Sequence, residues 1–173
     1  MPRNVEIKAR IADVGAVRAR AEAFADGPCA VLHQDETFFG VARGRLKLRV
    51  LGTGEAELIY YERPDVAGPK ECCYARAPVH DADALHALLS RAFPVLGRVR
   101  KRRTLYVVGQ TRIHVDEVKG LGDFVELEVV LRDKSAGRRR DARRPQPHAP
   151  PGRAQSRPRR GLLLGLDEAP PIT

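Results

Sequence analysis

Charged side chains recur at every second position in several stretches of the chain, and this spacing carries the clearest chemical meaning. In RGRLKLRV, residues 43–50, basic residues alternate with leucine and valine after Gly44. In FVELEVVL, residues 124–131, Glu126 and Glu128 alternate with apolar residues. Because successive side chains of a β-strand point to opposite faces, each pattern predicts a strand with one charged face and one apolar face.

Two arrangements fit such strands. Each charged face could simply be solvated, as in many antiparallel sheets. Alternatively, the charged faces could line the interior of a small barrel, where arginine and lysine bind phosphate oxygens and carboxylates hold Mg²⁺ or Mn²⁺. The candidate phosphate-binding cations are Arg45, Lys47, Arg49, Arg63, Lys101, Arg103 and Arg112. The candidate metal ligands are Glu6, Asp116, Glu126 and Glu128.

The carboxylates that lie between the cations would also reduce the electrostatic repulsion inside such a barrel. Two like charges 4 Å apart repel by roughly 4 kcal/mol at an effective dielectric constant of 20. A closed barrel with so many cations would therefore be unstable when empty unless acidic side chains stood among them. His114, which lies between Arg112 and Asp116, is expected to be a hydrogen-bonding partner rather than a metal ligand, because no second histidine has a useful spacing.

The rest of the sequence predicts the elements that position these side chains. Helices are expected at residues 12–24 and 82–93, where Asp13 and Asp81 are suitable N-caps. The basic strand at 99–108 could line the barrel interior with Lys101 and Arg103, or it could be an arm of a hairpin on the surface. Strands are predicted at residues 4–10, 29–41, 43–50, 55–63, 70–79, 99–108, 112–118 and 124–131.

The chain resembles the CYTH family, the triphosphate tunnel metalloenzymes, whose signature at the N-terminus is E-x-E-x-K. The match begins at Asn4-Val5-Glu6-Ile7-Lys8 and covers about the first three quarters of the chain. The opening motif is short, but the ordered series that follows it is specific. That series is GRLKLR (44–49), ELIYYERPD (57–65), GPK (68–70), VRKRRTLYVVG (99–109) and TRIHVDEVKGLGDFVELEVVL (111–131).

The resemblance implies an α+β fold, namely an antiparallel eight-stranded β-barrel with a charged interior and flanking helices. It also implies catalytic roles for Glu6 and Lys8, a phosphate-binding role for Lys8, and a Mg²⁺ or Mn²⁺ cofactor. Lys70 resembles a family lysine that reaches into the tunnel, although a lysine in a loop can also be merely solvated. Arg63 could take over the charge of a family lysine near Tyr61.

Three departures from the family pattern affect the prediction. Asn4 stands where the signature has its first glutamate. Phe38 and Phe39 occupy a region where many members carry a tyrosine. Relatives have an arginine directly after Tyr74, whereas here Ala75 follows and Arg76 comes one position later. We therefore expect Arg76 to face outward.

The function implied by the resemblance is metal-dependent hydrolysis of thiamine triphosphate, inorganic triphosphate or a nucleoside triphosphate. Conversion of ATP to cyclic AMP by a class IV type adenylate cyclase is the second candidate. Non-catalytic binding of organic phosphates or polyphosphate is the third. The expected partner is therefore a small triphosphate-bearing molecule, and the sequence leaves the choice among substrates and the oligomeric state open.

Composition divides the chain near residue 132. The whole chain has a formal charge of +9, but residues from Lys134 onward hold ten Lys or Arg against three Asp or Glu. Residues 1–132 are predicted to form the tunnel domain, and residues 133–173, rich in Arg and Pro, a disordered tail. Nucleic acid is not an expected partner except through this tail.

The tail lacks the amphipathic helix and last strand that the family has in this region. We hypothesise that it is a reading frame translated out of register after about Asp133; the alternative is a basic arm for nucleic acid or polyphosphate. Loss of the final helix and strand could leave the barrel incompletely closed.

No apolar run approaches the roughly 20 residues of a membrane helix, and the N-terminal residues have no apolar signal region. Cys72 and Cys73 are adjacent and Cys29 stands apart, so the cysteines have no metal-binding spacing. A cytoplasmic protein with reduced cysteines is expected.

Overall fold

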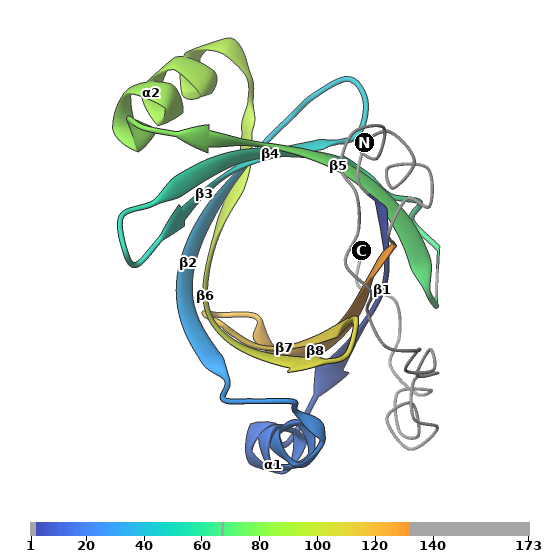
Figure 1. The fold of residues 1–173 in the computed structure, drawn as a ribbon. Coiled ribbons are helices and arrows are strands. Elements are labelled where there is room, and N and C mark those ends of the chain that lie inside the picture. Colours follow the sequence, from blue (N-terminus) through green and yellow to red (C-terminus); the bar gives the residue numbers. More distant parts are fainter. Residues whose placement is uncertain (1–2, 67, 132–173) are drawn as a thin grey trace, which may run out of the picture.

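The computed structural model describes residues 3–66 and 68–131. Eight antiparallel strands form a closed barrel in the order β1-β5-β4-β3-β2-β6-β7-β8 (Figure 1). The predicted α+β class and eight-stranded barrel are confirmed. The strands are β1 Arg3–Ile11, β2 Ala30–Phe39, β3 Arg45–Leu51, β4 Ala56–Glu62, β5 Lys70–Val79, β6 Val95–Val108, β7 Thr111–Val118 and β8 Gly122–Leu131.

The barrel closes where β1 pairs with β8. The pairing runs from Arg3 opposite Leu131 to Ile11 opposite Asp123. Our expectation of incomplete closure is therefore wrong, because β8 already covers the whole length of β1. The predicted loss of a final helix and strand, and the frameshift hypothesis, concern residues 132–173 and lie outside the described residues.

Two helices lie against the outside of the barrel (Figure 1). Helix α1, Val14–Phe24, begins at Asp13, whose carboxylate accepts a hydrogen bond from the Ala16 N–H at 2.9 Å. Helix α2, Ala82–Ala92, begins at Asp81, whose carboxylate accepts from the Ala84 N–H at 2.8 Å. Both predicted caps are confirmed. None of the helices in the described residues is long and apolar enough to cross a membrane.

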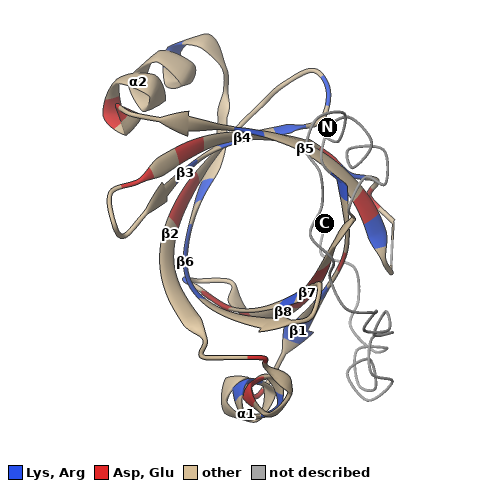
Figure 2. Ribbon diagram, in the orientation of Figure 1, with Lys and Arg blue, Asp and Glu red and all other residues tan. Residues whose placement is uncertain are grey.

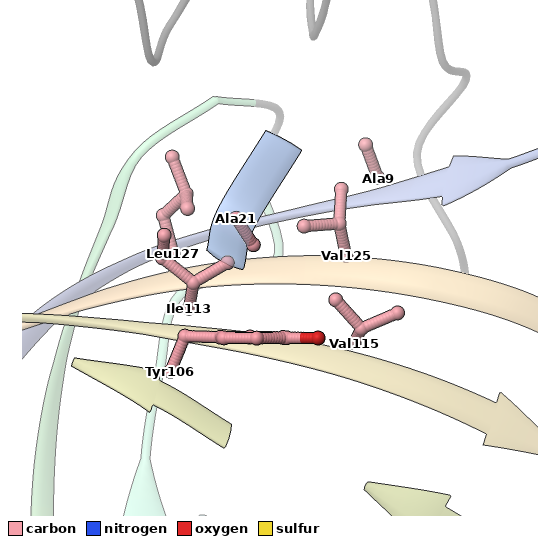
Figure 3. Packing of buried hydrophobic residues seen from close by; sticks show 7 residues of the cluster. All are labelled: Ala9, Ala21, Tyr106, Ile113, Val115, Val125 and Leu127. Carbon is pink, nitrogen blue, oxygen red and sulfur yellow. The ribbon is translucent and has the colours of Figure 1, made fainter. Parts of the chain in front are cut away.

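The apolar faces of the strands point outward into these helices. Ala21 of α1 packs against a cluster on β1, β6, β7 and β8 (Figure 3). Leu89 of α2 packs with Phe39 and Leu48, on β2 and β3. Because side chains alternate along each strand, the charged positions between these apolar residues face the barrel interior. The members of the first cluster are Ala9, Ala21, Tyr106, Ile113, Val115, Val125 and Leu127.

A tight turn brings two carboxylate-bearing strands together. Gly120 and Gly122, between β7 and β8, have φ values of +76° and +92°, which glycine adopts without the steric cost of a Cβ atom. The turn places His114 opposite Glu126 and Arg112 opposite Glu128 on neighbouring strands. Charged side chains that are far apart in the sequence thus become neighbours on the interior face.

Ile113 tests whether the cluster beneath α1 stabilises the fold. Its side chain is 2% exposed, so Ile113→Ala should leave a cavity and lower the free energy of unfolding by about 2–5 kcal/mol. Ile113→Val removes one methyl group and should cost about 0.5–1.5 kcal/mol. Urea denaturation monitored by circular dichroism measures both values. Equal stability of Ile113→Ala and the wild type would show that this face does not pack as described.

Candidate functional site

The predicted site residues all occupy interior-facing positions of the barrel. Acidic and basic segments stand side by side around its circumference (Figure 2). The predicted carboxylates lie on β1, β7 and β8, and most of the predicted cations lie on β3, β5 and β6. The interior positions are Glu6 and Lys8 on β1; Arg45, Lys47 and Arg49 on β3; Arg63 just after β4; Lys70 on β5; Lys101 and Arg103 on β6; Arg112 and Asp116 on β7; and Glu126 and Glu128 on β8.

Asp116 is the most deeply buried of the predicted carboxylates, with no exposed surface. Arg103 donates two hydrogen bonds to it, at 2.6 and 2.7 Å, and Lys8 and Lys101 lie 3.5 and 3.6 Å away. Burial by itself raises the pKa of Asp116, but the hydrogen bonds and charge of Arg103 outweigh it, so the pKa lies below its ordinary value. Asp116 is therefore an anion that neutralises neighbouring cations.

Three neighbouring side chains surround the carboxylate of Glu126. His114 Nδ1 lies 2.8 Å from its carboxylate, Lys8 at 3.5 Å and Arg103 at 3.6 Å. Burial raises the pKa of Glu126, yet the charge of Arg103 and the hydrogen bond from His114 hold it well below the ordinary range. The expected role of His114 as a hydrogen-bonding partner is confirmed.

Glu6 and Glu128 lie directly opposite each other on β1 and β8. Like charges in such a pair are destabilising unless other groups compensate them. Arg63 compensates Glu6, with a contact of 2.5 Å, and Arg112 lies 3.4 Å from Glu128. Asn4 Nδ2 also donates a hydrogen bond to Glu128. Asn4 Oδ1, in contrast, is buried and has no hydrogen-bond partner.

The donor chemistry of this wall fits a divalent cation. Glu6, Glu128 and Asn4 supply carboxylate and amide oxygens, and the unpartnered Asn4 Oδ1 is a free acceptor. Among residues 3–66 and 68–131, however, no three His, Cys, Asp or Glu side chains are already gathered as a metal site. A cation at this wall must therefore replace the cationic partners that these carboxylates now have.

Glu36 on β2 is an interior carboxylate that the sequence reasoning missed. Its side chain is 2% exposed, and it contacts Lys47 at 2.8 Å, Arg49 at 2.7 Å and Lys101 at 3.1 Å. Burial raises the pKa of Glu36, but the charges of Lys47, Lys101 and Arg49 hold it well below its ordinary value. No alternation of charged and apolar residues marks Glu36 in the sequence, because the preceding residue, Asp35, is also acidic.

Lys47 is a buried cation whose pKa lies well below its ordinary value. It lies 5.5 Å from the ring centre of Phe38 and 5.6 Å from that of Tyr61. Burial lowers the pKa of Lys47 to about 8, although the charge of Glu36 acts in the opposite direction. Lys47 therefore loses part of its charge just above neutral pH when no anion is bound.

Arg76 faces the interior, and our expectation that it faces outward is wrong. The pairing of β4 with β5 places Arg76 opposite Ile59 and Tyr74 opposite Tyr61. Arg76 lies 3.8 Å from Glu57 and over the ring of Tyr74. Its side chain is about half exposed, as expected near one end of the barrel.

Strand β6 carries basic residues on both faces. Lys101 and Arg103 point inward to Glu36 and Asp116, whereas Arg98 and Arg100 pair with Asp35 on the other face. The alternative of a basic surface arm is therefore wrong for Lys101 and Arg103. A basic surface is formed only by the residues that face outward on this strand, such as Arg98 and Arg100.

The comparisons with known proteins agree with this architecture. The family model of the CYTH domain matches residues 2–140. The chain belongs to the CYTH domain family. This assignment confirms the resemblance seen in the ordered motifs, while no curated protein matches the chain at a significant level.

Solved structures with the same fold come from distant relatives. PH1012 from Pyrococcus horikoshii OT3 is 24% identical, with a TM-score of 0.67 over 78% of this chain and 82% of its own. A putative adenylate cyclase from Vibrio parahaemolyticus is 18% identical, with a TM-score of 0.58 over 77% and 79%. HpAC1 from Hippeastrum, described as a putative adenylyl cyclase with dominant triphosphatase activity, is 16% identical, with a TM-score of 0.57 over 78% and 82%. At these identities the likeness establishes the CYTH fold alone.

Glu36→Gln tests the balance of charge around the three buried cations. Breaking a buried ion pair from one side typically costs about 3–5 kcal/mol, so the free energy of unfolding should fall by that order in urea titrations. Added inorganic triphosphate should restore more stability to Glu36→Gln than to the wild type, because the anion replaces the lost charge.

Asp35→Asn is the matched control for that variant. Asp35 is the preceding residue, faces outward and pairs with the exposed Arg98 and Arg100, so its loss should cost at most about 1 kcal/mol. If the two variants were equally stable, Glu36 would not balance the interior charge.

Lys47 should make anion binding depend on pH. As the pH rises above about 8, the empty protein loses the Lys47 proton, and affinity for triphosphate should fall by up to about tenfold per pH unit. The unfolded chain keeps this proton up to the ordinary pKa of 10.5, so Lys47 adds stability as the pH rises from about 8 to 10.5. Calorimetric titrations between pH 7 and 10 measure the affinity. Lys47→Arg, which stays charged, should remove the pH step, and persistence of the step would assign it to another group.

Proposed function

We propose that this CYTH protein is a divalent-metal-dependent hydrolase of a triphosphate-bearing substrate. The observation that supports this most is the continuous network of interior charges. Glu36 connects Lys47 and Arg49 to Lys101, and Lys101 connects this group to Asp116. Cations on β3 and β6 therefore belong to one interior network of ion pairs with Asp116 on β7, and Arg103 extends it to Glu126 on β8.

A triphosphate would bind by exchanging partners with the cations. Lys47, Arg49 and Lys101 would turn from Glu36 to the phosphate oxygens, and the flexible ammonium and forked guanidinium groups suit that exchange. Arg45 is available for the same purpose, because its present partner, Asp65, is largely exposed at the barrel end. Arg63, Lys70, Arg103 and Arg112 complete the proposed phosphate-binding set.

The metal would be held by the carboxylates of the opposite wall. Members of this family generally depend on a divalent metal, and Glu6 and Glu128 with Asn4 Oδ1 fit that need; Asp116 and Glu126 are the further proposed ligands. A bound Mg²⁺ or Mn²⁺ would neutralise phosphate charge. Glu6 would become available when Arg63 moves to the phosphates, because Arg63 is its present ion-pair partner.

The proposed reaction is attack of water on phosphorus, with cleavage of one phosphoanhydride bond. Glu6 and Lys8 occupy consecutive interior positions of β1 and are proposed to orient the water and the phosphate that it attacks. Lys8, 3.5 Å from both Asp116 and Glu126, would also keep these two carboxylates in position. Thiamine triphosphate, inorganic triphosphate and nucleoside triphosphates are the candidate substrates.

A class IV type adenylate cyclase is the second candidate, supported by the name of the Vibrio parahaemolyticus neighbour. Cyclisation requires that the ribose 3′-hydroxyl be held in line with the α-phosphate of ATP, whereas hydrolysis requires only a positioned water. The replacement of a signature glutamate by Asn4 supports a third candidate, a phosphate-binding protein without turnover.

A product screen separates the three candidates. Purified full-length protein with Mg²⁺ or Mn²⁺ should release phosphate or pyrophosphate from at least one triphosphate, and Glu128→Gln should lower that rate by about 10–100-fold while the substrate still binds. Glu71→Gln is the control, since Glu71 pairs with Arg3 on the exposed outer face. Cyclic AMP from ATP without hydrolysis would establish the cyclase instead, and binding without any product would overturn both enzyme functions.

A further inference from the structure

The amine of Lys47 lies beside two other interior cations. Its Nζ is 2.8 Å from Glu36 Oε1, and the guanidinium of Arg49 contacts the same oxygen at 2.7 Å. Lys101 contacts the other oxygen of Glu36 at 3.1 Å. Because Lys47 and Arg49 share one acceptor atom, their charged ends are no farther apart than the sum of those two contacts. A phosphate group bound by Arg49 would therefore hold its substituent next to Lys47 Nζ.

The surroundings of Lys47 favour its uncharged, nucleophilic form. Burial lowers the pKa of Lys47 to about 8, and the charges of Arg49 and Lys101 act in the same direction. At pH 7 roughly a tenth of such side chains are uncharged, against roughly one in three thousand for an ordinary lysine. Desolvation and neighbouring cations are the means by which proteins make lysine a nucleophile. The side chain remains 12% exposed, so a small reagent can reach it.

A nucleophilic amine beside phosphate-binding cations matches the chemistry of an acyl phosphate. Such a molecule joins a phosphate group, which guanidinium and ammonium groups bind, to a carbonyl carbon that an amine attacks. Lys119 provides the contrast, since it follows β7 in a turn and is exposed. Acylation without a binding site would favour Lys119, whereas a bound phosphate would direct the acyl group to Lys47.

We propose that Lys47 is a site of acylation by small acyl phosphates, with Arg49 and Lys101 holding the phosphate group. The Lys47 ammonium first releases one proton to solvent. Nζ then attacks the carbonyl carbon, so that a nitrogen–carbon bond forms and the bond from that carbon to the bridging phosphate oxygen breaks. The second proton passes from Nζ to the departing phosphate, which leaves as hydrogen phosphate. The product is a neutral amide on Lys47.

Acylation would regulate the proposed phosphate-binding site, because it removes one of the cations. A neutral amide keeps neither the positive charge nor the ion pair with Glu36. Loss of one charge-assisted contact should weaken the binding of inorganic triphosphate by at least about tenfold. This proposal rests on the phosphate-binding cations of the proposed function.

Acetylation of the full-length protein by acetyl phosphate tests the proposal without any assay of turnover. After digestion with a glutamate-specific protease, mass spectrometry can follow residues 37–55 and 118–126, which contain Lys47 and Lys119 as their only lysines. At pH 8, Lys47 should be acetylated at least about tenfold faster than Lys119, because far more of it is uncharged. Its rate should saturate as the acetyl phosphate concentration rises, and excess inorganic triphosphate should slow acetylation of Lys47 but not of Lys119.

A reagent without phosphate is the matched control. The acetyl ester of N-hydroxysuccinimide offers the same acyl group but nothing for Arg49 and Lys101 to bind, so the preference for Lys47 over Lys119 should fall by at least about tenfold. Arg49→Gln should slow acetylation of Lys47 by acetyl phosphate and leave that of Lys119 unchanged. An equal preference with both reagents would overturn the proposal, as would acetylation of Lys119 as fast as that of Lys47. Both comparisons of reagents use the wild type, so they stand even if Arg49→Gln fails to fold.

The two proposals can fail separately in these experiments. Hydrolysis of a triphosphate, but no preference of acetyl phosphate for Lys47, would remove the acylation site and leave the hydrolase. Saturable acetylation of Lys47 without turnover of any triphosphate would support the acylation site and remove the hydrolase.

Discussion

The structure depends on charge balance inside a closed space. Two cations 4 Å apart repel by roughly 4 kcal/mol at an effective dielectric constant of 20, and Lys47, Arg49 and Lys101 all converge on one point. Glu36 makes this arrangement possible by contacting all three. Asp116 does the same for Arg103, Lys8 and Lys101. The empty barrel is thus stabilised by the carboxylates that an anionic ligand would replace.

This balance of charge links interior side chains that lie on different strands. The cations of β3 contact Glu36, Glu57 and Asp65, whereas the carboxylates of β8 contact side chains on β1, β6 and β7. Lys101 on β6 connects them by contacting Glu36 on one side and Asp116 on the other. Under the proposed function, a ligand with several negative charges would take the place of these carboxylates, and binding would be a competition between internal and external anions.

The outer face of the barrel buries apolar side chains, whereas the inner face balances charges. Each strand must bury its apolar side, and the helices α1 and α2 cover two groups of these residues. Val115 and Asp116 show the consequence, since both have no exposed surface although they are adjacent in the sequence. One packs outward among apolar side chains and the other inward among cations. A shift of the β7 pairing by one residue would exchange these environments, so the charge pattern and the apolar pattern specify the register together.

The sequence by itself determined the faces of the strands, because alternation along an extended chain is a local property. It therefore predicted the interior positions of residues such as Arg45, Lys47, Glu126 and Glu128, the helix caps at Asp13 and Asp81, and the eight-stranded barrel through the family motifs. Tertiary structure decided which charges meet. Glu36 was not evident because its contacts come from β3 and β6, and the direction of Arg76 followed from its pairing with β4 rather than from its spacing after Tyr74. The closure of β1 onto β8 and the placement of Asn4 opposite Cys72 likewise depend on pairings between segments distant in the chain, which no local pattern encodes.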